Sequence, residues 1–405
     1  MQNFPEILTP YLQSETVFVK GSVAAVALAK AKLLVENELP IGLILAACFD
    51  LVVASKFYRF TKPENWLWCK HGDFDIYPIL NACPLCVLQN HFIKHNGNKP
   101  SSGSIGPSTS QALREILVAY YHLSGKGFLR VFNGSEPADL VVIDSKNKQC
   151  FIAEVKASPL FTPPLAVKHA SSSFQTDKDG ARPLNHFQGT LRNLHTQSVS
   201  LIIPQVGGKY TLWKMPPKGL GSDQWPDNAI ITAIRSDEDG FKKYLLSWVN
   251  MWNAYAEKNN SDALFYFTGA CGLPRHAGDE WEKSSNGKPV GTISDGKTSV
   301  GMDRTDDIKK STFQMLKLGI ESRNRDLGGW ALKIGLASNL HAARHHETYL
   351  KPYEDIVWGW SPERGVNPAD WYNLFDGIVS FSKSHTRDEW IQSLVAWHEN
   401  DGQKP

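Results

Sequence analysis

The chain has few long apolar runs, and we expect none of them to span a bilayer. Its most apolar stretch, residues 40–54, is short for a membrane span and carries Asp50, so we expect a buried helix there. The N-terminal residues also lack a basic segment followed by an apolar stretch and a small-residue cleavage site. We therefore expect a cytoplasmic protein without membrane contact.

Cysteine and net charge are both scarce. Six cysteines in 405 residues are too few for a disulfide scaffold, and three of them cluster at Cys69, Cys83 and Cys86, which favours metal binding. A net charge of +2 excludes a global attraction to polyanions, so any nucleic-acid surface must be a local patch. The length of the chain suits two or three structural units around a large core.

Strand-forming segments follow a predicted helix in the middle of the chain. We expect a helix from about residue 108, capped by Ser108 or Ser110, because one apolar stripe repeats at helical spacing. The stripe consists of Ala112, Leu113, Ile116, Leu117 and Tyr120. Strands are expected at residues 128–132, 139–143 and 150–155, then a helix at 187–194 and a strand at 199–203. This α-β-β-β-α-β order predicts the α/β (α+β) class, a mixed β-sheet flanked by helices.

Composition divides the chain into four expected parts. Residues 1–60 form a helical N-terminal region, 61–100 a small zinc module, 101–215 the α-β-β-β-α-β core, and 216–405 a C-terminal region that completes the core. Near the C-terminus, Thr386 and Glu389 form a capping-box pattern that predicts the start of a terminal packing or dimerisation helix.

An acid separated by one residue from a lysine occurs four times, and only Glu154 and Lys156 end a strongly apolar strand. Alternation along the strand places both side chains on one face. The turn-like residues 145–148 fold the chain back, so that residue 143 lies opposite 150 and 141 opposite 152. The same register brings Asp139 opposite Glu154, with Cβ atoms roughly 5 Å apart.

Two carboxylates this close repel each other unless a cation or a proton lies between them, and Mg²⁺ favours such oxygen ligands. Lys156 can hold a water molecule beside them and offset negative charge on a phosphorus centre. Asp139, Glu154 and Lys156 therefore predict a Mg²⁺-dependent centre for phosphodiester hydrolysis. The alternative is a surface hairpin with an ordinary salt-bridge cluster.

Glu136-Pro137-Ala138-Asp139, fourteen further residues and then Glu154-Val155-Lys156 resemble the motif of the PD-(D/E)xK nuclease superfamily, over roughly residues 108–205. Pro137 departs from the motif by standing two residues before Asp139 instead of adjacent to it. The resemblance implies a restriction-endonuclease-like core in which Asp139, Glu154 and the Val155 carbonyl bind Mg²⁺ and Lys156 assists water. It also suggests that Glu115, on the preceding helix, helps to organise the metal, although a solvated glutamate on the helix surface fits nearly as well.

Nucleases of this superfamily with a comparable length resemble type II restriction endonucleases, which act as homodimers on double-stranded DNA. By this analogy we expect a site-specific double-stranded DNA endonuclease, with recognition and dimerisation in residues 216–405. The alternatives are a repair or junction-cleaving nuclease of the same superfamily and a non-catalytic zinc-containing DNA-binding protein.

The cysteine cluster predicts a closed, structural Zn²⁺ site. Its expected ligands are Cys69, His71, Cys83 and Cys86, with His91 or His95 as an alternative to His71. A redox dithiol is the competing use of the Cys83–Cys86 pair, and Asn90 with His91 suggests only loosely a ββα-metal nuclease site.

Residues 297–351 are the best candidate for a DNA-contacting face, because basic side chains recur there among polar ones. The expected contacts are Arg304, Lys309, Lys310, Arg323, Arg325 and Arg344, with Asn324 or Asn339 available to recognise adenine. Acidic residues are interleaved with them, so a solvated charged surface is an equal alternative.

Overall fold

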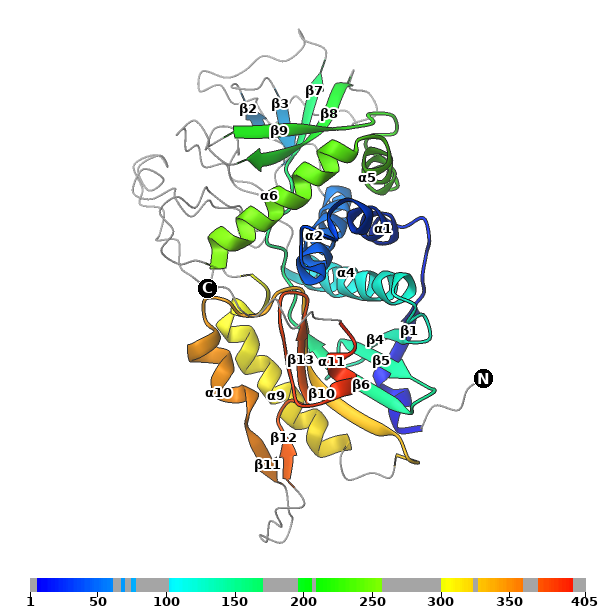
Figure 1. The fold of residues 1–405 in the computed structure, drawn as a ribbon, viewed down its shortest axis with the longest axis vertical. Helices are drawn as coiled ribbons and strands as arrows, with labels where there is room; N and C mark the ends of the chain where they lie inside the picture. The colour runs from blue at the N-terminus through cyan, green and yellow to red at the C-terminus, as the bar shows by residue number, and fades with distance from the viewer. Residues whose placement is uncertain are drawn as a thin grey trace.

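The computed structural model describes residues 6–60, 67–69, 74–77, 102–169, 196–205, 209–256, 300–322, 327–359 and 371–395. Two β-sheets lie toward opposite ends of the molecule, with a layer of helices between them (Figure 1). The segment expected to be a helix at 187–194 falls outside the described residues.

The larger sheet has seven strands in the order β1-β4-β5-β6-β10-β13-β14. Its strands are β1 Leu12–Thr16, β4 Arg130–Gly134, β5 Leu140–Asp144, β6 Gln149–Val155, β10 Ala331–Ser338, β13 Gly377–Ser380 and β14 Ser384–Thr386. The sheet is mixed, because β10 runs parallel to both β6 and β13 while the other pairs are antiparallel. The predicted mixed sheet flanked by helices is therefore present.

Two long helices cover the opposite faces of this sheet. Helix α4, Ser102–Leu123, packs on the face that includes Phe151 and Ala153 of β6. Helix α9, Thr305–Ser322, packs on the face that includes Ile152. Because side chains alternate along a strand, Glu154 lies on the same face of β6 as Ile152. That is the face of the sheet that α9 covers.

The strand that completes the core differs from the prediction. Residues 199–203 belong to β8, which pairs in the other sheet, whereas β10 occupies the place beside β6. Because α9 precedes β10, the α-β-β-β-α-β order is completed by α9 and β10. The polypeptide between β6 and α9 contributes three strands of the second sheet and two helices, so residues 101–215 are not one continuous core.

The second sheet has five strands in the order β2-β3-β7-β8-β9, all antiparallel. They are β2 Leu67–Cys69, β3 Phe74–Tyr77, β7 Leu165–His169, β8 Thr196–Gln205 and β9 Lys209–Met215. A separate ribbon joins β11 Val357–Gly359 to β12 Trp371–Asn373. The predicted strand at 199–203 therefore exists, as part of this sheet.

The helical layer contains α1 Val23–Val35, α2 Ile41–Phe60, α5 Trp225–Ser236 and α6 Glu238–Ala256. Among the described residues, α2 alone is long and apolar enough to cross a membrane, but 89% of that segment is buried inside the fold. Asp50 is fully buried on α2 and accepts hydrogen bonds from Trp248 Nε1 at 2.6 Å and Phe161 N at 2.7 Å. The buried helix expected at residues 40–54 is thus present as α2.

Shorter elements complete the chain: 3-10 helices η1 Glu6–Tyr11 and η6 Gly301–Asp303, the π-helical turn η7 His346–Leu350, and α-helices α10 Lys351–Glu354 and α11 Glu389–Gln392. Two predicted helix starts are wrong. Helix α4 begins at Ser102, ahead of Ser108 and Ser110. The N-cap of α11 is Asp388, whose side chain accepts from Ile391 N, while Thr386 ends β14.

Candidate functional site

The β5–β6 hairpin positions the candidate site through its turn and its register. At the turn, one Asp144 carboxylate oxygen accepts from the backbone N–H groups of Lys146 and Asn147, each at 3.0 Å. This arrangement is an Asx turn, which short polar residues favour. The ladder then pairs Val141 with Ile152 and Leu140 with Ala153, in the predicted register.

Asp139 lies one residue before β5, next to the last pair of this ladder, Leu140 and Ala153. Its N–H donates to the Ala153 carbonyl at 3.0 Å, and its Oδ2 accepts from Val155 N at 3.1 Å. Glu154 lies between these two contacts on β6, and Lys156 Nζ lies 2.5 Å from Glu154 Oε1. The structure therefore brings together Asp139, Glu154 and Lys156 as the sequence predicted.

Burial and a neighbouring carboxylate make Glu154 an unusual acid. Its side chain is 12% exposed. Burial raises the pKa of Glu154, and the charge of Asp139 raises it further, while Lys156 lowers it, with a result of about 7. One lysine does not fully offset two adjacent carboxylates. The pair consequently favours either a proton or a cation.

The backbone of Val155 adds a third oxygen at this edge. An extended residue directs its N–H and C=O to the same side of a strand, and the Val155 N–H faces Asp139. Because β5 begins only at Leu140, no further strand residue pairs with Val155 on that side. Its carbonyl therefore lies on the side of β6 that faces Asp139, and Val155 lines the same cleft.

The three charged residues open into a cleft of about 920 Å³. Its walls come from the first half of α4, the loop before β5, the end of β6 and the start of α9. Arg114, Arg304 and Lys310 line the cleft together with Asp139, Glu154 and Lys156. A strongly polar cleft that combines acids with cations can hold a phosphate ester beside a metal ion.

Two cleft residues were missed in the sequence. Arg114 is buried and donates from Nη1 to the Asp139 carbonyl at 3.2 Å, while its Nε has no hydrogen-bond partner among the described residues. Gln314 on α9 also presents a buried amide oxygen without such a partner. The sequence offered one indication of Arg114: it is a basic residue directly after the apolar pair Ala112–Leu113 on α4.

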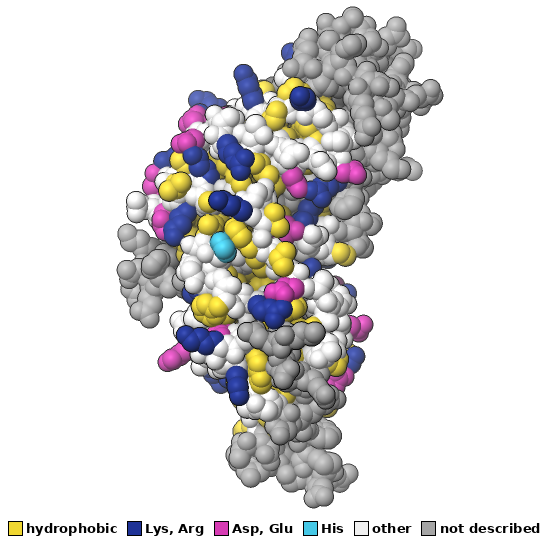
Figure 2. Space-filling view, turned by 90° about the vertical axis from the view of Figure 1, so that its right-hand side faces the viewer, with side chains coloured by type: hydrophobic (Ala, Val, Ile, Leu, Met, Phe, Trp, Pro, Cys, Tyr) yellow, Lys and Arg dark blue, Asp and Glu magenta, His cyan; other side chains and the backbone are white. Residues whose placement is uncertain are grey.

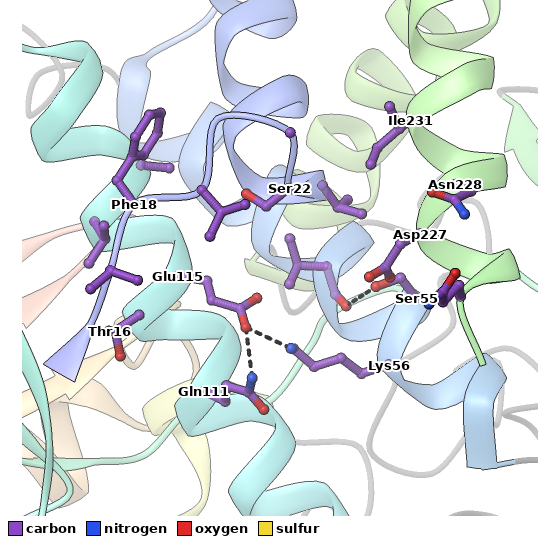
Figure 3. Close-up of a pocket in the computed structure, with 18 of the residues that line it drawn as sticks. Thr16, Phe18, Ser22, Ser55, Lys56, Gln111, Glu115, Asp227, Asn228 and Ile231 are labelled. Carbon is purple, nitrogen blue, oxygen red and sulfur yellow. Dashed lines mark hydrogen bonds and ion pairs between the residues drawn. The ribbon is translucent and has the colours of Figure 1, made fainter. Parts of the chain in front are cut away.

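Glu115 is placed differently from the prediction (Figure 3). Its Oε1 accepts from Lys56 Nζ at 2.9 Å and from Gln111 Nε2 at 2.8 Å, and the three residues line a separate pocket toward α2 and α5. Because consecutive helix residues point about 100° apart, Arg114 faces the carboxylates and Glu115 does not. The expectation that Glu115 helps to organise the metal is therefore corrected.

The expected DNA contacts fall in several places. Arg304 and Lys310 line the cleft, whereas Lys309 is exposed beside Asp306 and outside it. Arg344 is only 8% exposed and stacks over the Tyr255 ring at 5.4 Å, so it is not part of an exposed DNA-contacting face. Arg323 and Arg325 lie outside the described residues.

Asn339 is also buried, because its side-chain amide bonds the backbone N–H and C=O of Ser158 at 3.0 and 2.8 Å. It is not available to recognise adenine. On the face of the molecule in Figure 2, lysines and arginines are interspersed with acidic and hydrophobic side chains. This mixture of charges agrees with the low net charge. The cleft, where Arg114, Arg304 and Lys310 gather, is therefore the better candidate for binding an anion.

The expected zinc ligands cannot be placed together. Cys69 ends strand β2, and His71, Cys83, Cys86, His91 and His95 lie outside the described residues. The structural Zn²⁺ site at these residues remains a prediction.

Comparisons with protein-family models, with curated proteins and with solved structures gave no match to this chain.

Proposed function

We propose that the protein is a Mg²⁺-dependent endonuclease that hydrolyses phosphodiester bonds in double-stranded DNA through Asp139, Glu154 and Lys156. The observation that carries the proposal is the convergence of two carboxylates and one lysine at the open end of a buried hairpin. The core around them, α4-β4-β5-β6-α9-β10, is the order expected of a restriction-endonuclease-like nuclease.

The donor atoms fit Mg²⁺. Asp139, Glu154 and the Val155 carbonyl supply oxygen only, which suits a hard cation. Burial raises the pKa of Glu154, and the charge of Asp139 raises it further, while Lys156 offsets only part of this rise. When bound, the ion would supply Lewis-acid help and a water of lowered pKa. A closed four-ligand zinc centre does not fit here, because no thiol or imidazole lines this cleft among the described residues.

The protein side chains then divide the work of hydrolysis. Lys156 orients the attacking water and offsets charge on the phosphoryl oxygens, while Arg114 adds a second cation beside Asp139. Water supplies the new P–O bond, one ester P–O bond breaks, and the departing oxygen takes up a proton. Arg304 and Lys310 bind the phosphates that flank the scissile bond.

Duplex DNA is the proposed substrate because cations line the cleft from two helices, α4 and α9. Two copies of the chain would place two such centres on antiparallel strands, so we propose a homodimer that cuts at a specific site.

The test is incubation of the full chain with long duplex DNA and Mg²⁺, followed by separation of the products. Discrete fragments are the expected result, and EDTA should abolish them. Nicks confined to branched or mismatched DNA would instead favour a repair or junction-cleaving nuclease. Binding without any cleavage would overturn the enzymatic proposal.

A further inference from the structure

Three imidazole rings surround the buried carboxylate of Glu354, apart from the carboxylate pair described above. His346 Nε2 lies 2.9 Å and His341 Nε2 lies 3.6 Å from the same oxygen, Glu354 Oε1. His385 Nδ1 lies 3.6 Å from the other oxygen, Oε2. One ligand atom each from His341, His346 and Glu354 falls within 4.8 Å of the other two.

The fold brings these residues together from three places. His341 follows β10, and its backbone N–H is held by Ser382 Oγ at 2.8 Å. His385 comes from β14. His346 and Glu354 are eight residues apart, which in a regular α-helix would turn their side chains about 80° away from each other. The wider π-helical turn η7, where Lys351 N bonds His346 O, brings them to the same face.

His341 is a buried histidine whose ring is unpaired within the described part of the chain. Its side chain is 3% exposed, and neither ring nitrogen has a hydrogen-bond partner among the described residues. Buried polar atoms are nearly always paired, so an orphaned imidazole that faces a carboxylate calls for an explanation. A metal ion between His341, His346 and Glu354 would bind the ring nitrogen that each of the two histidines turns toward the carboxylate.

We propose that His341, His346 and Glu354 bind a divalent transition-metal ion of the zinc class. Tetrahedral zinc, with bonds of about 2.0–2.1 Å, holds its ligand atoms roughly 3.4 Å apart. The observed separations of 2.9 and 3.6 Å lie on either side of this spacing. Imidazoles select such an ion over Mg²⁺. His385, on the second carboxylate oxygen, orients Glu354.

The ion would fasten the segment after β10 to the wall of the cleft. Ser338 Oγ, at the end of β10, donates to the Lys156 carbonyl at 2.7 Å. Arg344 N and His345 N both donate to Asp303 Oδ1 at 2.9 Å, and Asp303 precedes the cleft residue Arg304. The metal site therefore braces the segment that links these two contacts. Its existence does not depend on nuclease activity.

His346→Gln and His345→Gln form a matched pair for the test. Glutamine at 346 can still donate to Glu354, so folding is preserved, while His345 is a neighbour whose ring lies edge-on to Tyr349 with centroids 5.8 Å apart. Each full-length protein is loaded with Zn²⁺, dialysed and analysed for metal. We expect His346→Gln to hold one equivalent less than wild type and His345→Gln to hold the wild-type amount.

Cobalt substitution separates this site from the cysteine cluster. The difference between the Co²⁺ spectra of wild type and His346→Gln should contain ligand-field bands without sulfur-to-cobalt charge transfer. The affinity for that Co²⁺ equivalent should fall at least tenfold in the variant. Equal metal content in the two proteins, or a difference spectrum dominated by thiolate bands, would overturn the proposal.

Discussion

The backbone N–H of Val155 donates to the Asp139 carboxylate across 3.1 Å, so the strand that carries one acid of the site also holds the other. Asp139 precedes β5 and would otherwise belong to a loop. Because two backbone groups of β6, Val155 N–H and Ala153 C=O, hold Asp139, the two carboxylates are held close before any ion binds. Their proximity has consequences for stability as well as for chemistry.

Glu154→Gln should stabilise the metal-free protein at high pH. The pKa of Glu154 is raised from 4.5 to about 7 in the folded state, so folding favours its protonated form. That contribution is complete below about pH 4.5 and is lost as the pH rises to about 7. Glutamine does not ionise, so the variant does not lose stability in this way as the pH rises. In urea unfolding with EDTA we expect the variant to exceed wild type by about 1–3 kcal/mol at pH 8, and by much less at pH 4.5.

The matched control for this measurement is Glu136→Gln. Glu136 is exposed in the same cleft, so its amide should change the unfolding free energy little at either pH. A stability difference for Glu154→Gln that stayed constant across this pH range would contradict the account of its pKa.

Glu115→Gln should affect stability more than cleavage. Lys56, whose side chain is 10% exposed, would lose its carboxylate partner, at a cost of about 1–3 kcal/mol. We expect the cleavage rate at saturating Mg²⁺ to stay within about threefold of wild type, because Glu115 lies outside the cleft of the carboxylate pair. Thermal unfolding and a single-turnover assay measure the two effects.

The double variant Lys56→Met with Glu115→Gln is the control, since it removes both charges and should recover part of the lost stability. If Glu115→Gln kept full stability but lost cleavage by a hundredfold, Glu115 would have to act at the metal after all.

Arg304→Gln and Lys310→Gln should weaken binding to duplex DNA and lower its salt dependence. Each phosphate contact that is removed reduces the slope of log K against log salt by about one. Lys309→Gln, on the same helix but outside the cleft, should leave the slope nearly unchanged. Fluorescence anisotropy at several salt concentrations, with Ca²⁺ in place of Mg²⁺, provides the measurement. Equal slopes for all three variants would exclude the cleft as the DNA site.

Arg344→Gln should act on folding instead. The Arg344 side chain packs over Tyr255, whose hydroxyl donates to Asp303 at 2.8 Å. Replacement should lower the thermal midpoint through loss of buried packing and leave the salt slope for DNA intact. A changed slope at unchanged stability would return Arg344 to the DNA-contacting residues.

The hairpin could be predicted because its determinants are local. The turn at residues 145–148 and the alternation in β5 and β6 set the register within sixteen residues, and Asp139, Glu154 and Lys156 follow from it. The apolar stripe of α4 was recognisable for the same reason. Its start was not, because the helix continues through Pro107 to Ser102.

The remaining features depend on contacts between distant segments. Nothing in residues 199–203 distinguishes a strand of one sheet from a strand of another, so the sequence predicts β8 in the core, where the structure has β10. Lys56 decides the orientation of Glu115 from 59 residues away. The histidines around Glu354 come from separate elements and show no recognisable ligand spacing in the sequence.

The central claim is tested most directly by Mg²⁺-dependent cleavage of long duplex DNA by wild type, Asp139→Asn and Glu136→Gln. Both substitutions change one acid of the same cleft to its amide, but only Asp139 faces Glu154. We predict cleavage by wild type and Glu136→Gln, and a loss of at least a hundredfold in Asp139→Asn with DNA binding retained. Cleavage by Asp139→Asn at the wild-type rate would contradict the account.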